Sequence, residues 1–475
     1  MFIFLIISSI LTNIIGIIVF PFKLTNLKMN INNDDTNIVD NFLSEINKNK
    51  IYSTIKIGNP SKNLELILSS NIFYYAIIQN FCPIGSDSSY NPYESQDYYN
   101  ITKNDISYGL INQGHIAIDK CFFYNDLDLK NILEVSNFSY FLGDYIFKDD
   151  EKDSIEPNKF CGYFGIIDRY YLLSYPENFI RYLKKEKIID TYSWSIFFFN
   201  KDYAYNINEE IQNKYDGLYI VGINENDIYN IFKTTDIYVT HESKNKNTLG
   251  IVIKFNKIYY NNTNNNSAIL CSNDAELGID YNYIYSDKIY FESIKETFFK
   301  KYFENKICSE KNSSGVFSNH IIICEKAIKK DLHTFPDLNF FSFELSYTFK
   351  LDYNDLFIEI NNKIYFMVIQ RGIFDSLWEL GKIFMKKYPF IFDQDKSSIY
   401  FIHLNKKEKN DSKSFWDKNK NSILYILLSI GILIGIIVGI FVGKKLWKKR
   451  KSRANELDED VDYINKEEKF TNIID

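Results

Sequence analysis

Two long apolar segments near the ends of the chain limit where the chain can reside and how the residues between them can fold. Residues 1–20 carry no charged side chain and are almost wholly apolar, which is typical of an export signal or a signal anchor. The second segment, Ile423–Val442, matches the roughly 20 apolar residues that a helix needs to cross a bilayer. We therefore expect the chain to enter the secretory pathway and to be anchored by a transmembrane helix near its C-terminus.

Charges, cysteines and sequons indicate the side of the membrane on which the long middle part lies. Basic residues cluster between Lys444 and Arg453, which the positive-inside rule places in the cytoplasm, although the lysine-rich residues 406–420 compete with this signal. All six cysteines and the N-glycosylation sequons precede the second apolar segment, as expected in an oxidising, glycosylating lumen. The sequons begin at Asn100, Asn137, Asn261, Asn265, Asn312 and Asn410. The prediction is a single-pass type I membrane protein of the endoplasmic reticulum, Golgi or cell surface, with its main domain lumenal or extracellular.

Composition excludes some classes of function. With 45% hydrophobic and 24% charged residues, the chain is expected to form a folded body rather than a disordered one. A formal charge of -6 gives no general attraction to nucleic acid. We expect no nucleic-acid partner, no cofactor and no metal.

The middle of the chain is dominated by short strand-like runs. Apolar and polar residues alternate over residues 51–57 and again over residues 64–68, and Gly58-Asn59-Pro60 predicts a turn between these two strands. Helical spacing of apolar residues predicts helices at residues 178–187 and 294–303. The body is therefore expected to be mainly β.

A short internal echo adds a second kind of information. Ile67-Leu68-Ser69-Ser70-Asn71 recurs as Ile269-Leu270-Cys271-Ser272-Asn273, each time after a strand-like run. In a chain rich in Ile, Ser and Asn, such an echo is explained either by accident or by a true duplication.

The order of the motifs resembles that of the pepsin-like aspartic proteases, from about Ile51 to Leu404. Residues 52–77 resemble the family's opening strand pair, with Ser69-Ser70-Asn71 where the family has Asp-Thr-Gly. Cys271-Ser272-Asn273 stands where the family has its second Asp-Thr-Gly. The other matching segments are Ser107-Tyr108-Gly109, residues 160–166, residues 194–198, residues 217–222, Trp378-Glu379-Leu380-Gly381 and residues 384–401. The C-terminal anchor is similar to that of members such as plasmepsin V and the beta-secretases.

This resemblance implies a bilobal, mainly β fold followed by a single C-terminal transmembrane helix. The expected parts are a signal peptide or signal anchor (1–22), an N-terminal lobe (45–200), a C-terminal lobe (201–405), a lysine-rich stalk (406–422), the transmembrane helix (423–443) and a cytoplasmic tail (444–475). Tyr108 and Gly109 would lie in the flap hairpin over a peptide-binding cleft. Cys308 and Cys324 flank the place of the family's C-terminal-lobe disulfide, and Cys82 with Cys121 is the second pair that we predict. Six cysteines allow fifteen connectivities, and Cys161 and Cys271 would then stay free or pair with each other.

The substitutions remove the family's chemistry. In that family, two carboxyl groups share a proton and activate water. A serine hydroxyl does not ionise in the working range, and an unperturbed thiol has a pKa of about 8.5, so neither Ser69 nor Cys271 replaces a general base. The remaining readings of Cys271 are a nucleophile, which needs a nearby base, or a small buried residue. Rescue by a shifted carboxylate is disfavoured, because Asp274 and Glu276 follow the turn.

Three further features keep two readings each. Glu379 replaces an aliphatic residue and is either buried at a cost or turned to solvent. The glycines Gly431, Gly435, Gly439 and Gly443 lie on one face of the membrane helix, which either permits homodimerisation or reflects the frequency of glycine in such helices. The basic cluster after Val442 is either a topology signal alone or also a contact to anionic lipid.

Three functions are then weighed. The first is a catalytically inactive protease-like protein that binds an extended peptide or protein in its cleft, because backbone hydrogen bonds and side-chain pockets grip peptides without the catalytic carboxyls. The second is an active aspartic-type endopeptidase with noncanonical site residues. The third is a structural or adhesive ectodomain.

Overall fold

The computed structural model describes residues 16–25, 37–70, 75–78, 90–101, 106–108, 111–146, 160–166, 178–232, 234, 236–241, 251–260, 274–313, 318–372, 378–404, 435 and 438–450. The chain divides into two compact units, Met1–Lys407 and Glu408–Asp475. All strands with assigned bounds belong to the first unit.

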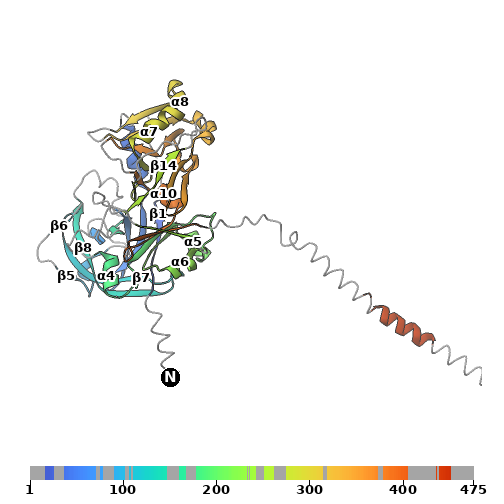
Figure 1. Cartoon of the computed structure of the whole chain (residues 1–475). Helices are drawn as coiled ribbons and strands as arrows, with labels where there is room; N and C mark the ends of the chain where they lie inside the picture. The colour runs from blue at the N-terminus through green and yellow to red at the C-terminus, as the bar shows by residue number, and fades with distance from the viewer. Residues whose placement is uncertain are drawn as a thin grey trace, which may run out of the picture. The chain divides into compact units, whose positions relative to one another are not determined.

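A 14-stranded sheet forms the larger part of the first unit (Figure 1). Its strands are β1 Ile18–Leu24, β2 Ile51–Ile57, β3 Lys62–Ser69, β4 Tyr75–Ile78, β5 Tyr99–Asn100, β6 Ile106–Tyr108, β7 Ile111–Tyr124, β8 Ile132–Ile146, β9 Gly162–Gly165, β10 Ser193–Phe198, β11 Gly217–Val221, β12 Ile237–His241, β25 Phe390–Asp393 and β26 Ser398–Ile402. They lie in the order β12-β26-β25-β10-β11-β1-β2-β3-β9-β4-β8-β7-β5, with β6 paired to β7. Strands from both ends of the folded body therefore meet in one sheet. The predicted lobe boundary at residue 200 falls between β10 and β11, which pair with each other.

The first strand of this sheet comes from the segment that the sequence places in an export signal. β1 pairs antiparallel with both β11 and β2, and Ile18, Phe20 and Phe22 are almost fully buried in the core. Residues 18–22 therefore belong to the folded body, and the boundary that we predicted at residue 22 lies too far along the chain. Residues 1–15 lie outside the described residues.

Two smaller sheets form the other part of the first unit. The nine-stranded sheet contains β13 Ile251–Lys254, β15 Asp274–Leu277, β16 Ile284–Ser286, β17 Cys308–Asn312, β18 His320–Glu325, β21 Phe357–Ile360, β22 Lys363–Phe366, β23 Val368–Gln370 and β24 Trp378–Leu380. The three-stranded sheet contains β14 Lys257–Tyr260, β19 Leu338–Ser342 and β20 Tyr347–Leu351. The mainly β prediction is confirmed.

Short helices cover these sheets. They are α2 Ile38–Asn47, α4 Phe179–Lys185, α5 Glu209–Lys214, α6 Glu225–Phe232, α7 Lys288–Ile294, α8 Lys300–Glu304, α9 Tyr353–Leu356 and α10 Lys382–Lys387, with 3-10 turns at Pro92–Glu94 and Lys326–Thr334 and a π-helical turn at Lys295–Phe299. The predicted helix at 178–187 is α4, capped by Asn178. The predicted helix at 294–303 begins earlier, at Lys288, because Asp287 caps α7 there.

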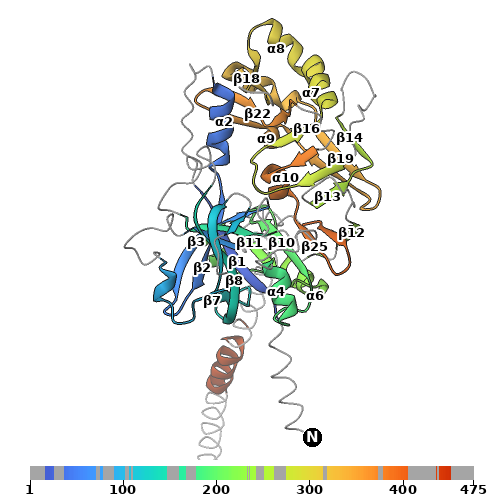
Figure 2. The same cartoon turned by 90° about the vertical axis from the view of Figure 1, so that its left-hand side faces the viewer.

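Helix α2 lies in the sequence between β1 and β2 of the large sheet but packs on the nine-stranded sheet (Figure 2). Its apolar face buries Phe42, whose ring stacks on Tyr365 with centroids 4.5 Å apart. The amide of Asn282 donates to the carbonyl oxygens of Ile46, at 2.7 Å, and Asn49, at 3.2 Å. The N-terminal 50 residues thus contribute a strand to one sheet and a helix to the other.

The predicted strand pair at the start of the motif series is confirmed. β2 and β3 pair antiparallel from Tyr52 opposite Ile67 to Ile57 opposite Lys62, across the predicted turn. Gly58 in this turn has φ +85°, a left-handed conformation that glycine adopts without strain. Gly162 on β9 is required for a different reason: a Cβ there would lie 2.1 Å from the carbonyl oxygen of Ala76 on β4.

The cysteines agree with the prediction in part. Cys308 and Cys324 lie opposite each other on β17 and β18 and form a disulfide, as predicted. The predicted pair of Cys82 with Cys121 is not formed, because Cys121 is a free thiol buried inside β7, where it packs in the apolar core. Cys82 and Cys271 lie outside the described residues.

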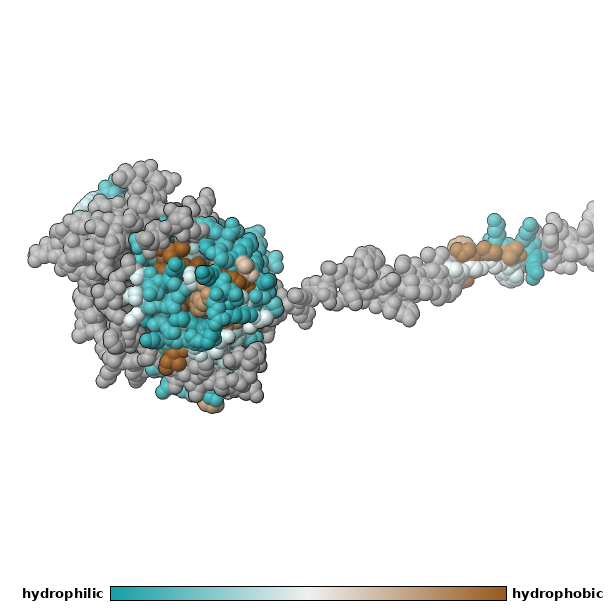
Figure 3. Space-filling view, turned by 90° about the horizontal axis from the view of Figure 1, so that it is seen from above, coloured by the Kyte–Doolittle hydropathy of each residue, from teal (hydrophilic) through white to brown (hydrophobic). Residues whose placement is uncertain are grey.

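The second unit is described only in part. Residue 435 and residues 438–450 are helical, and Figure 3 shows apolar residues followed by hydrophilic ones along this helix. Among the described residues, no helix has both the length and the apolar character needed to cross a bilayer. Most of the predicted membrane helix, including Gly431, and all of the predicted stalk from residue 406 to 422 lie outside the described residues.

Candidate functional site

The first predicted half-site lies where two strands end side by side. β3 runs parallel to β9, and Ser69, the last residue of β3, lies opposite Gly165. Ser69 and Ser70 are buried, with 3% and 5% of their surfaces exposed. The sheet therefore delivers the Ser69 hydroxyl to an interior position rather than to the surface.

The same arrangement occurs once more in the nine-stranded sheet. β15 runs parallel to β24, with Leu277 opposite Leu380, and the next residue, Gly278, donates its N–H to the Leu380 carbonyl at 3.1 Å. Continuing this register by one residue matches Gly278 and Gly381, directly after their strands, to Ser69 and Gly165 at the ends of β3 and β9. The two parallel strand pairs thus place Ser69 and Gly278 in matching positions.

This position differs from the one assigned by the sequence echo. Cys271, Ser272 and Asn273 lie outside the described residues, and β15 begins only after them, at Asp274. The residue that follows the strand in the way that Ser69 does is therefore Gly278, not Cys271. Asn71 of the first half-site also lies outside the described residues.

The two matching turns are joined by hydrogen bonds. The Ser70 hydroxyl oxygen accepts the Ile279 N–H at 3.2 Å. Asp280, one residue further, accepts the Ser69 hydroxyl on Oδ1 at 2.8 Å and the Ser70 N–H on Oδ2 at 2.8 Å. The Ser70 hydroxyl also donates to Oδ2. Both oxygens of the Asp280 carboxylate are therefore engaged by the serine turn.

Asp280 was missed by the sequence reasoning. Its partners lie about 210 residues earlier in the chain, at sequence separations of 211 and 210. The available signal was the alternation in Ala275-Glu276-Leu277, a strand that is followed by Gly278-Ile279-Asp280. Asp274 and Glu276, which we considered as shifted carboxylates, are instead part of β15 itself.

A buried lysine lies beneath this carboxylate-bearing turn. Lys382, 1% exposed at the start of α10, donates from Nζ to the carbonyl oxygens of Ile279, at 2.7 Å, and Asp280, at 3.5 Å. Burial, then repulsion from Lys50, lowers the pKa of the Lys382 ammonium well below its usual value, although Asp280 attracts the charged form. The lysine therefore ties α10 to the main chain of the second turn.

Glu379 is neither buried without a partner nor turned to solvent, the two alternatives that the sequence left open. Its side chain is 17% exposed and forms a two-pronged ion pair with Arg371, with 2.9 Å between Arg371 Nη2 and Glu379 Oε2. The Arg371 guanidinium lies over the Tyr285 ring, 4.0 Å from its centroid. Burial lowers the pKa of Arg371, but the charge of Glu379 outweighs this and raises it overall. A half-buried acid is thus stabilised by a stacked, fully charged partner.

At the place predicted for the flap, the chain forms a hairpin. β6 pairs antiparallel with β7, with Tyr108 opposite Ile111 and Ile106 opposite Gly114. Only the backbone of Tyr108 is described, and Gly109 lies outside the described residues. Among the residues that the structure describes, no group of three or more His, Cys, Asp or Glu side chains is placed to hold a metal ion.

We predict that Asp280→Ala lowers the free energy of unfolding of the full chain by about 3 kcal/mol, because Ser69 and Ser70 lose the acceptor for three hydrogen bonds in a buried place. Urea unfolding would measure the change. Asp274→Ala, on the strand before the turn, is the matched control and should change stability by less than about 0.5 kcal/mol. Equal stabilities of the two variants would show that the carboxylate does not join the turns.

A second prediction concerns pH. The folded-state pKa of Lys382 lies below its unfolded value, so the unfolded chain binds one more proton between the two values. Wild-type stability should therefore rise relative to Lys382→Met as pH increases from neutral toward about 10, by up to about 1.4 kcal/mol per pH unit. Parallel pH profiles in urea unfolding of the two proteins would contradict the lowered pKa.

Comparisons with known proteins give the fold and no closer relative. Neither a search of protein-family models nor a search of curated proteins finds a match. Among solved structures, the chain is similar to conglutin gamma, a basic 7S globulin from lupine seeds, with 12% identity, a TM-score of 0.54 and coverage of 82% of this chain and 95% of that chain. It is also similar to the basic 7S globulin from soybean, with 10% identity, a TM-score of 0.51 and coverage of 82% and 96%. Basic 7S globulins have a pepsin-like fold, and at this low identity the likeness shows that fold for the present chain and nothing finer.

Proposed function

We propose that this chain is a catalytically inactive pepsin-like protein that binds an extended peptide or protein segment in the cleft between its lobes. One observation carries the first half of this proposal. The two matching strand ends hold Ser69 and Gly278, and the carboxylate nearest to them, Asp280, has both oxygens hydrogen-bonded to the serine turn. The pepsin-like fold agrees with this reading.

The chemistry of the fold family explains why this arrangement does not support hydrolysis. Two carboxyls are needed, one ionised and one protonated, because a single water is activated by one and the peptide carbonyl is protonated by the other. Asp280 supplies one carboxyl group, and its oxygens already accept three hydrogen bonds. Loss of general-base catalysis alone lowers a rate by about 10²–10⁴.

The binding half of the proposal uses what the fold retains. A β-hairpin flap, β6 with β7, and a buried hydrogen-bonding turn are the elements that grip an extended peptide through its backbone in this fold family. Neither element depends on a catalytic carboxyl. Peptide binding therefore does not require catalytic activity.

Asp280 also defines the alternative function. An acid in the turn where the second catalytic group is expected is the observation that favours residual endopeptidase activity. A structural or adhesive ectodomain, in which the cleft has no ligand, is the third possibility. The three are separated by measuring binding and turnover on the same preparation.

We predict that the purified full chain binds members of a mixed peptide library but cleaves none between about pH 3 and 7, with or without a pepstatin-like inhibitor. Mass spectrometry would report cleavage, and retention on immobilised peptides would report binding. Tyr108→Ala should weaken binding, because the flap loses its aromatic side chain. Pepstatin-sensitive hydrolysis that Asp280→Asn or Ser69→Ala abolishes would replace the proposal by the endopeptidase. Absence of both binding and cleavage would favour the structural ectodomain.

We further propose the membrane topology that the sequence predicts, with an architecture similar to that of plasmepsin V and the beta-secretases. In the described helix, Val438, Ile440 and Phe441 expose 54%, 53% and 72% of their surfaces, which is costly in water and favourable in lipid. Lysines follow at 444, 445, 448 and 449. A Cβ at Gly435, Gly439 or Gly443 would meet no described atom within 4 Å, which leaves room for a second helix of a homodimer. In the first unit, the sequon residues Asn100, Asn137 and Asn312 are exposed.

This topology predicts that the full chain stays with membranes during alkaline carbonate extraction and that deletion of residues 423–442 releases it. Treatment with an endoglycosidase should lower the apparent mass of the chain. In Asn137→Gln this decrease should be smaller by the mass of one glycan. A chain that carbonate extracts from membranes, or that carries no glycan in a glycosylating host, would exclude this part of the proposal.

A further inference from the structure

A pocket lies on strands of the large sheet. Its volume is about 230 Å³, and it is lined by Val19, Phe20, Pro21, Thr54, Lys56, Asn63, Phe122, Phe123, Tyr124, Ile132 and Tyr215. These residues come from β1, β2, β3, β7, the start of β8 and the residue after α5. None of them belongs to the site around Ser69 and Asp280.

The walls of the pocket are mostly apolar. Phe20 and Phe123 are 2% and 3% exposed and touch edge to face, with ring centroids 5.4 Å apart. Ile132, at the other extreme, is 49% exposed. A pocket with buried aromatic rings and an exposed apolar residue favours an occupant with an apolar body.

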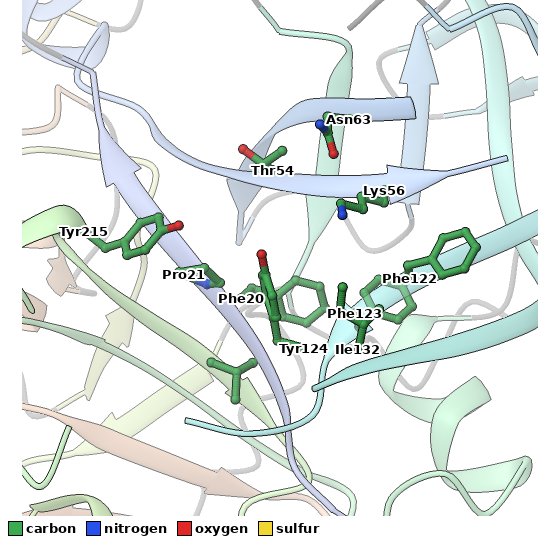
Figure 4. A pocket seen from close by; sticks show the side chains of 11 residues that line it. Phe20, Pro21, Thr54, Lys56, Asn63, Phe122, Phe123, Tyr124, Ile132 and Tyr215 are labelled. Atoms are coloured by element: carbon green, nitrogen blue, oxygen red, sulfur yellow. The ribbon is translucent and has the colours of Figure 1, made fainter. Parts of the chain in front are cut away.

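Polar groups of the pocket gather on one side of this apolar surface. Figure 4 shows the hydroxyls of Tyr124 and Tyr215 and the ammonium of Lys56 extending toward the same open space. The Lys56 ammonium forms no ion pair or hydrogen bond with the residues that the structure describes. Burial, and after it the neighbouring Tyr215, raises the pKa of Tyr124, although Lys214 opposes this, so the Tyr124 phenol is a neutral hydrogen-bond donor.

Further positive charge lies at the edge. Lys23 and Lys214 approach the Tyr215 ring with their ammonium groups 5.8 Å and 5.3 Å from its centroid. None of the described residues that line the pocket carries a carboxylate. An anionic group is therefore the charge that this side of the pocket accommodates.

We propose that this pocket binds a small apolar acid, a single ring or short hydrocarbon chain that carries a carboxylate. The apolar body lies on Phe122, Tyr124 and Ile132, and the carboxylate pairs with Lys56 and accepts hydrogen bonds from the phenol groups. Size limits the ligand: a cavity of about 150 Å³ lined by apolar side chains holds one benzene ring, so this pocket takes one substituted ring but no large lipid. This site is independent of the peptide cleft and of the loss of catalysis.

The test uses the full chain and 4-(4-fluorophenyl)butyrate, whose fluorine NMR signal reports binding. We expect saturable binding to the wild type, at least about tenfold weaker binding to Lys56→Gln, and unchanged binding to Lys254→Gln, which removes an exposed positive charge elsewhere. The neutral alcohol analogue, 4-(4-fluorophenyl)butanol, should have the same affinity for the wild type and for Lys56→Gln. That affinity should be as low as the affinity of the acid for Lys56→Gln.

A blocking variant tests the place of binding. Asn63 is an exposed residue of β3 on the pocket wall, and Asn63→Trp fills the opening without disturbing the core. Binding of the acid should be lost in this variant while its thermal unfolding midpoint stays that of the wild type. Equal binding of the acid to wild type, Lys56→Gln and Asn63→Trp, or no saturable binding to the wild type, would overturn the proposal.

Discussion

The hydrogen bonds of the Asp280 carboxylate hold together two turns that the chain brings from far apart. Ser69 and Ser70 end a strand of the large sheet, whereas Asp280 follows a strand of the nine-stranded sheet. A carboxylate that accepts three donors in a half-buried place is a strong local interaction, because hydrogen bonds to a charged group are about twice as strong as neutral ones. The same bonds that join the halves also occupy the oxygens that catalysis would require.

The strand pairing of the two sheets already places the serine turn next to the turn that contains Asp280. Each turn follows a strand that runs parallel to a second strand, and a glycine stands at the end of that second strand, Gly165 as the last residue of β9 and Gly381 directly after β24. Lys382, directly after Gly381, then anchors α10 to the carbonyls of the second turn. This backbone frame consists of main-chain pairings, so it does not depend on which side chains stand at residues 69 and 278.

Local patterns in the sequence predicted most of the fold. The alternation in residues 51–57 and 64–68, the helix that Asn178 begins and the Cys308–Cys324 pair are confirmed. The second half-site was misplaced, because the echo of Ile67–Asn71 at residues 269–273 is a local likeness, whereas the true position depends on which strand pairs with β24. Asp280, Lys382 and the pocket beside Lys56 could not be predicted, since each is assembled from segments distant in sequence. The free thiol of Cys121 likewise follows from its inward direction on β7, which spacing does not reveal.

The N-terminal 50 residues have a consequence for motion in this fold. β1 is hydrogen-bonded between β2 and β11 of the large sheet, while α2 is docked on the nine-stranded sheet through Phe42 and Asn282. A rotation of one lobe against the other would have to move the N-terminal segment with both of its attachments or break the contacts of β1 or of α2. Hinge opening, the usual way in which two-lobed proteins admit and release what they hold, is thereby restrained. In the binding that we propose, entry of a peptide would then depend on movement of the β6–β7 hairpin rather than of whole lobes.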